Sequence, residues 1–542
     1  METFSRLTLP QLIHDVAESC PESEALVAGS ARLTYKGLDE LSRRVAGAFI
    51  GLGAAPGQRV GLLCTNSWHW PVAAIGAMTA GARVDAFNTW VKAWDLEYLL
   101  TTSECSVLVI SSHVKSTDLL VELKSLLPEL WDSPVGEWTS SRFPALRSVV
   151  VIGSEAPQGA FLWDELIASA EGVSSDYVRC LSEDTAFVMY TSGTTSRPKA
   201  VPLIHRDLIA NSFQIGERIG LTSTDRVWLT SPLFWSFGGA NAMMATFTHS
   251  ACLVLQEYFN PEDALGLIRD ERCTTGYLLP SIAESLSVVA PDIAALGHLR
   301  KGVTIGRPDE IRRVIEELGV SDVCNVYGST EVYGNCCVTP HDADLNTRIT
   351  SQGPPLDGVE IRVVDDEGLP IGIDKPGELQ VRGRVMSGYL SQVSNGLTLS
   401  FTSDGWFQTG DRARIDARGY MYFLARETDM IKTSGINISP AEVEAFLSQH
   451  PLVSEVVVVG APHPTRDQVA VAFATTNGQV SGSDLRQFCK EGIADYKVPY
   501  DVVILEKLPQ TDTGKVTRNE LSQLAAHRVE EIIQEQSKFA GH

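Results

Sequence analysis

The sequence predicts an α/β protein with a large N-terminal domain of α/β layers, a β-rich subdomain and a small α+β C-terminal domain. Through roughly the first 420 residues, short apolar strands alternate with helix-length segments, a pattern typical of parallel α/β layers. From about Gly353 onward, strands are separated by Asp-Glu-Gly and Gly turns, which indicates antiparallel pairing. A chain of 542 residues is also too long for one hydrophobic core.

The strands expected in the α/β part are short apolar runs, each next to a segment of helical length. They span 59–65, 106–112, 148–154, 226–232 and 251–257. We therefore assign residues 1–425 to the N-terminal domain, with the β-rich subdomain from about 353. Residues 426–428 form a hinge and residues 429–542 a mobile lid domain.

The C-terminal domain is expected to begin with a well-defined helix. Ser439 stands at the N-cap, Pro440 at the first helical position and Glu442 at the third, which predicts a capping box. Val443 and Phe446, together with Leu447, give that helix one apolar face. Strands are expected over 453–460, 468–475 and 502–509, with a helix over 484–493.

Charge and composition exclude several classes of function. The formal charge of −23 argues against nucleic-acid or anionic-membrane partners, since both require a basic surface. No apolar run approaches the roughly 20 residues of a membrane span, and the acidic N-terminus does not look like a secretory signal. Ten scattered cysteines without a CxxC pair indicate reduced thiols in a cytoplasmic protein. The adjacent Cys336 and Cys337 near His341 are poor chelators, so no metal site is predicted there.

Five segments occur in a fixed order along the chain. They are YTSGTTSRPKA (190–200), NVYGSTE (325–331), GWFQTGD (405–411), RETDMIKTSGINISPAEVE (426–444) and LPQTDTGKVTR (508–518). Their order and spacing resemble the superfamily of AMP-forming acyl-CoA synthetases, peptide-synthetase adenylation domains and luciferases. The resemblance runs from LTYKGL (33–38) to the TDTGK turn and is strongest to acyl- or aryl-CoA ligases.

The resemblance implies three catalytic residues. Carboxylate activation brings two anions together, so the site must cancel their repulsion. Lys515 would bridge the carboxylate and the α-phosphate, and the Thr330 hydroxyl would bond that phosphate. Glu331 would hold Mg²⁺, which prefers oxygen ligands.

The resemblance also implies a nucleotide site. Tyr327 would stack on adenine, Asp411 would accept the ribose hydroxyls and Arg426 would hold the nucleotide at the domain boundary. The loop after Tyr190 is not a Walker A sequence, which excludes kinase and motor functions. The remaining nucleotide-binding residues are Thr191, Ser192, Gly193, Thr194, Thr195, Lys199, Gly306, Arg307, Gly328 and Ser329.

The acceptor and acyl sites follow from two further segments. Lys432, Ser434 and Gly435 resemble the loop that lines the pantetheine tunnel, with a hinge at Thr428, so coenzyme A is the expected acceptor. A peptide-synthetase domain needs an acid where Trp235 stands, because a buried ammonium requires a partner. The acyl pocket is expected to be apolar and aromatic, lined by Trp235, Phe237, Gly238, Gly239 and Tyr333.

Several residues depart from the family pattern on the ATP side. Ser196 and Ala200 replace glycines, Gly306–Arg307 replaces a Gly-Gly-Ala-Pro loop, and Trp235 replaces a histidine.

The expected function is an acyl-CoA ligase that joins an apolar aryl or fatty acid to CoA through acyl-AMP. An alternative is a thioesterification-only ligase supplied with acyl-adenylate by a separate enzyme, because side chains on a phosphate loop hinder backbone approach. Less favoured are an acyl-AMP ligase with a carrier-protein acceptor and a non-catalytic acyl-adenylate- or CoA-binding protein. The sequence leaves a homodimer open.

Overall fold

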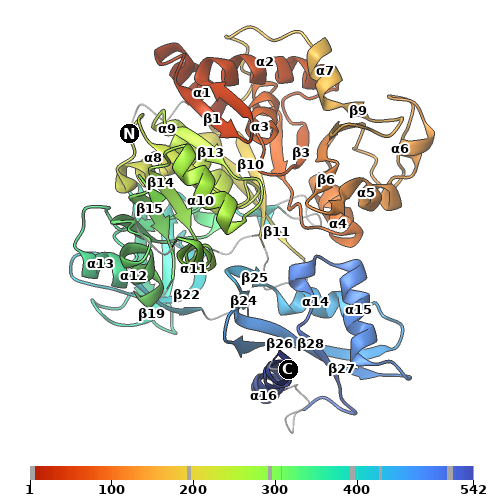
Figure 1. Cartoon of the computed structure of the whole chain (residues 1–542), viewed down its shortest axis with the longest axis vertical. Coiled ribbons are helices and arrows are strands. Elements are labelled where there is room, and N and C mark those ends of the chain that lie inside the picture. Colours follow the sequence, from red (N-terminus) through yellow and green to blue (C-terminus); the bar gives the residue numbers. More distant parts are fainter. Residues whose placement is uncertain are drawn as a thin grey trace. The chain divides into compact units, whose positions relative to one another are not determined.

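The computed structural model describes residues 7–191, 197–290, 296–306, 308–390, 397–398, 401–426, 430–509 and 517–540 (Figure 1). The chain divides into two compact units. The larger unit contains residues 1–89, 99–190 and 200–426, and the smaller contains 90–98, 191–199 and 427–542. The grouping of 90–98 and 191–199 with the C-terminal part is not indicated by the sequence.

The first sheet of the larger unit has the order β21-β20-β11-β10-β4-β3-β5-β8-β9, and its strands from β10 to β9 are parallel. The strands predicted over 59–65, 106–112 and 148–154 are present as β3, β5 and β8. The strand bounds are β3 Arg59–Leu63, β4 Arg83–Ala86, β5 Val107–Ser111, β8 Ser148–Ile152, β9 Phe161–Leu162, β10 Thr185–Thr191, β11 Lys199–Ile204, β20 Tyr389–Leu390 and β21 Leu397–Thr398. The helices of this region are α2 Tyr35–Gly51, α3 His69–Thr79, α5 Leu119–Leu126, α6 Glu129–Asp132 and α7 Trp163–Ser169. The helix α4 Ala93–Ser103 begins among the residues of the smaller unit and ends among those of the larger one.

The second sheet has the order β17-β16-β15-β14-β12-β13-β1-β2 and is parallel from β16 to β1. The strands predicted over 226–232 and 251–257 are present as β12 and β13. The strand bounds are β1 Glu24–Ala28, β2 Ala31–Thr34, β12 Arg226–Leu229, β13 Cys252–Leu255, β14 Thr275–Leu278, β15 Lys301–Thr304, β16 Asp322–Tyr327 and β17 Cys337–Val338. Helical segments of this region are α1 Leu9–Ser19, α8 His205–Ile219, the π-helix η2 Ser236–Met243, α9 Met244–Thr248, α10 Pro261–Asp270, α11 Pro280–Val289, α12 Pro308–Glu316, the 3₁₀-helix η4 Thr330–Val332 and α13 Leu345–Thr350.

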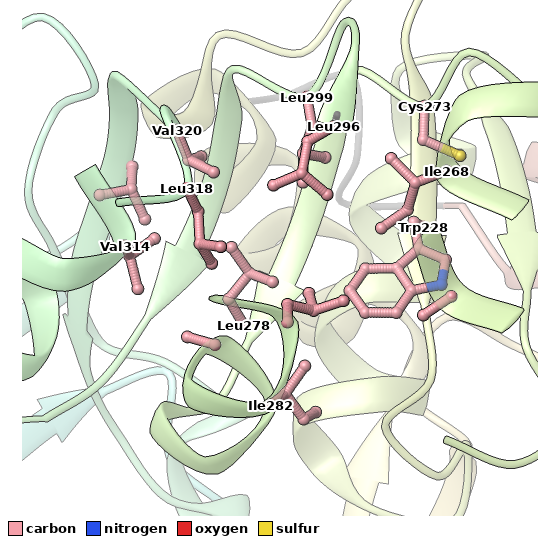
Figure 2. Packing of buried hydrophobic residues seen from close by; sticks show 14 of the residues in the cluster. Trp228, Ile268, Cys273, Leu278, Ile282, Leu296, Leu299, Val314, Leu318 and Val320 are labelled. Atoms are coloured by element: carbon pink, nitrogen blue, oxygen red, sulfur yellow. The ribbon is translucent and has the colours of Figure 1, made fainter. Parts of the chain in front are cut away.

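A cluster of buried apolar side chains packs α10, α11 and α12 against the second sheet (Figure 2). Trp228 of β12 lies at one side of the view and is fully buried, and Leu278 of β14 and Val320 belong to the same cluster. Burial of large apolar side chains is the main source of stability in such a layer. The cluster includes Val323 and therefore fixes β16, at the end of which the predicted nucleotide-binding residues begin.

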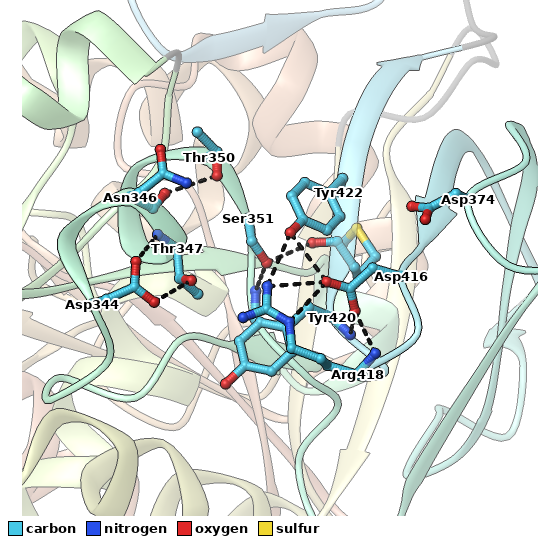
Figure 3. Close-up of polar contacts among 12 residues, drawn as sticks. Asp344, Asn346, Thr347, Thr350, Ser351, Asp374, Asp416, Arg418, Tyr420 and Tyr422 are labelled. Carbon is cyan, nitrogen blue, oxygen red and sulfur yellow. Dashed lines mark hydrogen bonds and ion pairs between the residues drawn. The ribbon is translucent and has the colours of Figure 1, made fainter.

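The β-rich part is an antiparallel sheet of β18 Val359–Val364, β19 Gly377–Gly383, β22 Phe407–Ile415 and β23 Met421–Arg426, as expected. The β22–β23 turn is built around Asp416 (Figure 3). Its carboxylate accepts hydrogen bonds from the backbone N–H groups of Arg418 and Tyr420, at 2.9 and 3.0 Å, and from the Arg418 guanidinium and the Tyr422 hydroxyl. This network sets the start of β23, the last strand of the larger unit.

The smaller unit contains a sheet of order β25-β24-β27-β26, with β28 parallel to β27. Its elements are β24 Ile431–Thr433, β25 Ile436–Ile438, α14 Pro440–Leu447, β26 Val453–His463, β27 Asp467–Thr476, α15 Gly482–Gly492, the 3₁₀-helix η5 Asp495–Lys497, β28 Asp501–Ile504 and α16 Arg518–Ala540. The predicted strands and helices of this part are present, but the strand predicted over 502–509 ends at Ile504. The apolar face of α14 is also confirmed, because Val443, Phe446 and Leu447 are buried.

The capping box predicted for α14 forms only in part. Ser439 Oγ accepts a hydrogen bond from the Glu442 N–H at 3.4 Å, as an N-cap should. The Glu442 carboxylate, however, is paired with Lys497 Nζ at 2.7 Å. A buried ammonium attracts the carboxylate more strongly than a backbone N–H does, so the side chain turns away from the N-cap.

All ten cysteines are free thiols, and nine of them are buried. Burial raises the pKa of the Cys105, Cys252 and Cys324 thiols to about 12. These thiols are therefore protonated and behave as small apolar side chains. Within the described part of the chain, no helix combines the length and the apolar composition needed to cross a membrane.

Candidate active site

The candidate nucleotide site of the larger unit starts from Tyr327, the last residue of β16. Its hydroxyl donates to Asp411 Oδ2 of β22 at 2.6 Å, and its ring stacks with that of Phe423 at 6.1 Å. Burial and then the neighbouring Asp411 carboxylate raise the pKa of Tyr327 well above its ordinary value, so the phenol remains a donor. The structure thus brings together an aromatic ring and a buried carboxylate that suit a nucleoside, the ring for stacking and the carboxylate for ribose hydroxyls.

The two predicted catalytic residues of the larger unit lie in η4, directly after β16. Glu331 Oε1 accepts a hydrogen bond from the Tyr389 hydroxyl at 2.8 Å, and its backbone carbonyl accepts one from the Met386 N–H at 2.8 Å. Thr330 Oγ1 donates to Ser236 Oγ at 3.0 Å. These contacts present the Glu331 carboxylate, an oxygen ligand of the kind that Mg²⁺ prefers. The Thr330 hydroxyl directs its one proton to Ser236 and would have to turn it toward a phosphate oxygen to bond a phosphate.

Close packing explains two glycines of the predicted site. A Cβ on Gly328 would lie 2.2 Å from the Gly334 carbonyl oxygen, so no side chain fits there. Gly306 has φ +144°, and a Cβ would lie 2.6 Å from Glu310 Oε2. Gly328 therefore requires glycine for local packing, because the clash is with backbone, whereas Gly306 favours glycine for its backbone conformation, because the end of the Glu310 side chain could move aside.

The predicted acyl residues lie on η2 and after η4. Trp235 is the N-cap of the π-helix, and the ring of Phe237 packs edge-on against Tyr277 at 5.1 Å. Gly238 and Gly239 are buried, and a Cβ on either would clash with a backbone carbonyl at 2.2 or 2.1 Å. A π-helix is rare and is frequently found at functional sites.

Tyr333, the fifth predicted acyl residue, adopts a left-handed conformation with φ +61°. Its ring is fully buried, and its hydroxyl accepts a hydrogen bond from the Ile204 N–H at 3.3 Å. The conformation of a non-glycine residue in this region costs roughly 1–3 kcal/mol, and such strain clusters at functional sites.

The predicted phosphate loop is shorter than the sequence suggests. Thr191 ends β10, while Lys199 and Ala200 belong to β11, where Ala200 pairs with Leu390 of β20. Placing Lys199 and Ala200 in a loop is therefore wrong, because strand pairing continues closer to the turn than the small polar residues indicate. Ser192, Gly193, Thr194, Thr195 and Ser196 lie outside the described residues.

The three residues predicted to bind CoA lie together in the smaller unit. Lys432 belongs to β24, and Ser434 and Gly435 form the two-residue turn that joins β24 to β25. Their φ values of +47° and +82° are those of a tight hairpin turn, for which glycine is the favoured second residue. The Ser434 N–H donates to the Arg466 carbonyl at 3.0 Å and holds the hairpin against the sheet.

The remaining predicted site residues stand at the ends of described segments or outside them. Lys515, Arg307 and the hinge residue Thr428 lie outside the described residues. The backbone of Arg426 is described and pairs with Asp411 in the β22–β23 register. Ser329 precedes η4 as its N-cap residue.

Two contacts of the site escape sequence reasoning. Tyr389 holds Glu331 from 58 residues away, and Ser236 holds Thr330 from 94 residues away. Neither residue belongs to a segment with a recognisable charge or turn pattern. The only signal for Ser236 is its place between Trp235 and Phe237, which were themselves predicted to line the acyl pocket.

Comparison with known proteins covers nearly the whole chain. A family model described as AMP-binding enzyme matches residues 13–390, and one described as AMP-binding enzyme C-terminal domain matches residues 442–515. The putative acyl-CoA synthetase YngI of Bacillus subtilis is 32% identical over 534 residues, which cover 95% of this chain and 96% of that protein. The human mitochondrial medium-chain acyl-CoA ligase ACSF2 is 30% identical over 542 residues, covering 95% of this chain and 87% of that protein.

Solved structures agree with this assignment. A variant of o-succinylbenzoate CoA synthetase (MenE) from Bacillus subtilis superposes with a TM-score of 0.80 at 25% identity and covers 95% of this chain and 98% of that one. The anthranilate CoA ligase AuaEII, in complex with anthranoyl-AMP, superposes with a TM-score of 0.70 at 26% identity and covers 96% and 98%. The predicted fold class and family are confirmed: the chain belongs to the AMP-binding enzyme family and is an AMP-forming acid–thiol ligase.

Proposed function

We propose that this ligase joins an apolar aryl or fatty carboxylic acid to coenzyme A in two steps, first forming acyl-AMP from ATP and then the thioester. The observation that carries the proposal is that two pairs of predicted site residues meet where β16 ends and η4 begins. One pair is Tyr327 with Asp411, and the other is Thr330 with Glu331. The first pair suits a nucleoside and the second suits a magnesium-bound phosphate. The acyl-CoA synthetases and ligases among the relatives support the same reaction.

The cofactors of the reaction are ATP, Mg²⁺ and coenzyme A. Mg²⁺ would be held by Glu331 and would supply positive charge to the phosphate oxygens when bound. Tyr389 keeps the Glu331 carboxylate oriented, and Ser236 keeps the Thr330 hydroxyl in place. Lys515 remains the proposed bridge between carboxylate and α-phosphate.

Coenzyme A as the acceptor is supported by a cavity in the smaller unit. The cavity has a volume of about 520 Å³ and reaches from Thr433 and Ile438, on either side of the hairpin turn, to α15. Arg466, Arg486 and Lys490 line it together with one acid, Asp495. Tyr496 and Tyr500 add aromatic surface. In a chain of net charge −23, a concave site with three cations and two rings suits the phosphorylated adenosine end of CoA.

Removal of two cavity charges should reveal which end of CoA binds there. In the Arg466→Gln, Lys490→Gln double variant, we expect KM for CoA to rise about 10-fold and KM for dephospho-CoA to stay nearly unchanged. The reason is that only CoA carries the 3′-phosphate that these cations would contact. Steady-state kinetics with both thiols measures this, with Lys507→Gln as the control, since Lys507 is exposed and does not line the cavity. An equal change for both thiols would place the phosphate elsewhere.

Supplying acyl-AMP in place of ATP separates the two half-reactions. The protein is incubated with acid, ATP, Mg²⁺ and CoA, and in parallel with synthetic acyl-AMP and CoA, over a panel of aryl and fatty acids. We expect thioester in both mixtures, with AMP and pyrophosphate released in the first. Thioester from acyl-AMP alone would instead support the thioesterification-only alternative, and acyl-AMP without thioester would support a carrier acceptor. No product in either mixture would refute the proposed function.

The structure weakens one argument for the thioesterification-only alternative. Ala200, which replaces a glycine, lies within β11 with its methyl group buried, so it adds no side chain to the phosphate loop. The relatives named as complete synthetases and ligases do not favour that alternative either. A separate adenylating enzyme is then not required.

Other expectations from the sequence stay predictions. They are the domain limits 1–425 and 429–542, rotation of the C-terminal domain about Thr428, a homodimer and a cytoplasmic location.

A further inference from the structure

A chain of buried hydrogen bonds lies behind the residues proposed to line the acyl group. The Tyr277 hydroxyl of β14 donates to Asn241 Oδ1 of η2 at 2.8 Å, and Asn241 Nδ2 donates to Asn335 Oδ1. Tyr277 and Asn241 are fully buried, and Asn335 is 4% exposed. Buried polar side chains are costly unless they are bonded or serve a ligand.

The direction of these bonds follows from Tyr277. Burial raises the pKa of this phenol well above its ordinary value, so it always carries a proton that needs an acceptor. Asn241 must therefore present its oxygen to Tyr277 and its NH₂ group to Asn335. Asn335 accepts the bond from Asn241 with its side-chain oxygen, so its own NH₂ group takes no part in this chain of hydrogen bonds. The opposite orientation would leave the phenol proton without an acceptor in the buried site.

The NH₂ group of Asn335 is a hydrogen-bond donor that has no acceptor among the described residues. It donates to no residue that the structure describes, and it is not among the fully buried polar atoms without a partner. The backbone of Asn335 is held in place, because Asn211 Nδ2 donates to its carbonyl at 2.9 Å and to that of Tyr333 at 3.2 Å. The donor is therefore preorganised, and it is not completely enclosed, although Asn335 as a whole is only 4% exposed.

Its position is between the acyl and catalytic segments. A Cβ on the neighbouring Gly334 would lie 3.4 Å from Asn241 Cβ and 3.5 Å from the Ser236 carbonyl, so this stretch lies directly against η2. Ser236 also holds Thr330, and Phe237 packs against Tyr277. An acyl group along η2 would thus meet the Asn335 amide away from its carboxylate end.

We propose that the Asn335 amide donates a hydrogen bond to the substrate, so that the preferred acid carries an acceptor oxygen, such as a carbonyl, ether or hydroxyl, at a distance from its carboxylate. This inference rests on the proposed function and narrows its substrate class. The site then discriminates against plain hydrocarbon acids, because such an acid would exclude water from the Asn335 NH₂ group without accepting a hydrogen bond from it. The expected preference is on the order of 10- to 100-fold in kcat/KM.

Matched acids test the inference directly. Adenylation is measured as acid-dependent AMP and pyrophosphate release for benzoate against the isomeric methoxybenzoates, and for octanoate against isomeric keto-octanoates. We expect at least one oxygenated isomer to exceed its hydrocarbon parent by about 10- to 100-fold in kcat/KM, mainly through KM. Equal rates for all isomers and their parents would overturn the inference while leaving the ligase activity established. No turnover of any acid, from ATP or as acyl-AMP, would refute the proposed function and the inference with it.

Variants assign the preference to the amide. In Asn335→Leu, which keeps the side-chain size and removes the donor, we expect the ratio of kcat/KM between the oxygenated acid and its hydrocarbon parent to fall to about one. Asn346→Leu, a change of the same type at an exposed position of α13, should leave the preference intact. Should Asn335→Leu fail to fold, Tyr277→Phe removes only the hydroxyl that orients the chain of bonds and should reduce the preference. A preference that survives these variants would overturn the assignment.

Discussion

Replacement of Lys515 by alanine should abolish most adenylation while sparing thioester formation. A preorganised cation that meets charge developing between two anions contributes about 10²–10³ in rate, so we expect adenylation to fall at least that much. The bridging role belongs to the first step only, because the acyl-adenylate already contains the bond between carboxylate and phosphate. Pyrophosphate release from acid and ATP measures the first step, and thioester formed from synthetic acyl-AMP and CoA measures the second.

Lys507 provides the matched control for this variant. It lies eight residues before Lys515 in the sequence, is exposed, and lies outside the five motif segments. Lys507→Ala should therefore change both half-reactions less than about twofold, the effect of an ordinary surface substitution. Equal losses of both half-reactions in Lys515→Ala would contradict the bridging role and point to a structural one.

Most of the fold follows from short-range patterns in the sequence. Strands such as β3, β5 and β12 are apolar runs with defined ends, and the Ser434–Gly435 turn has the residue type that a tight hairpin needs. The family motifs similarly predict Tyr327, Thr330, Glu331 and Asp411 as site residues without any structure. These features depend on neighbours in the chain, which is why sequence reasoning finds them.

The supporting contacts of the site could not be found in that way. Tyr389 reaches Glu331, and Asn335 reaches Asn241, only because β-pairing and the π-helix bring distant segments together. Polar pairing of this kind leaves no periodic signal. The Glu442 carboxylate is a further example. The local capping rule predicted a bond within its own helix, but the carboxylate pairs with Lys497, 55 residues away.

Lys497 should make the largest electrostatic contribution to the stability of the smaller unit. Lys497 Nζ lies 2.8 Å from Asp95 Oδ1 and 2.7 Å from Glu442 Oε1, and all three residues are buried. Burial alone would lower the pKa of Lys497, but Tyr496, Asp95 and Glu442 together raise it well above its ordinary value. The ammonium therefore stays charged, and both carboxylates depend on it.

Replacement of Lys497 by methionine should consequently lower the local unfolding free energy of the smaller unit by about 3–5 kcal/mol, because two buried carboxylates lose their counter-charge. Amide hydrogen exchange in β26 and β27 measures this free energy without assuming that the whole chain unfolds in one step. Lys507→Met should change it by less than about 0.5 kcal/mol, as expected of an exposed lysine. The triple variant Asp95→Leu, Glu442→Leu, Lys497→Met removes all three charges at once and should recover much of the loss, because apolar side chains of similar size replace a buried ion cluster at little cost. A loss below about 1 kcal/mol in Lys497→Met would mean that water reaches the two carboxylates, and the cluster would then contribute to the position of Asp95 rather than to stability.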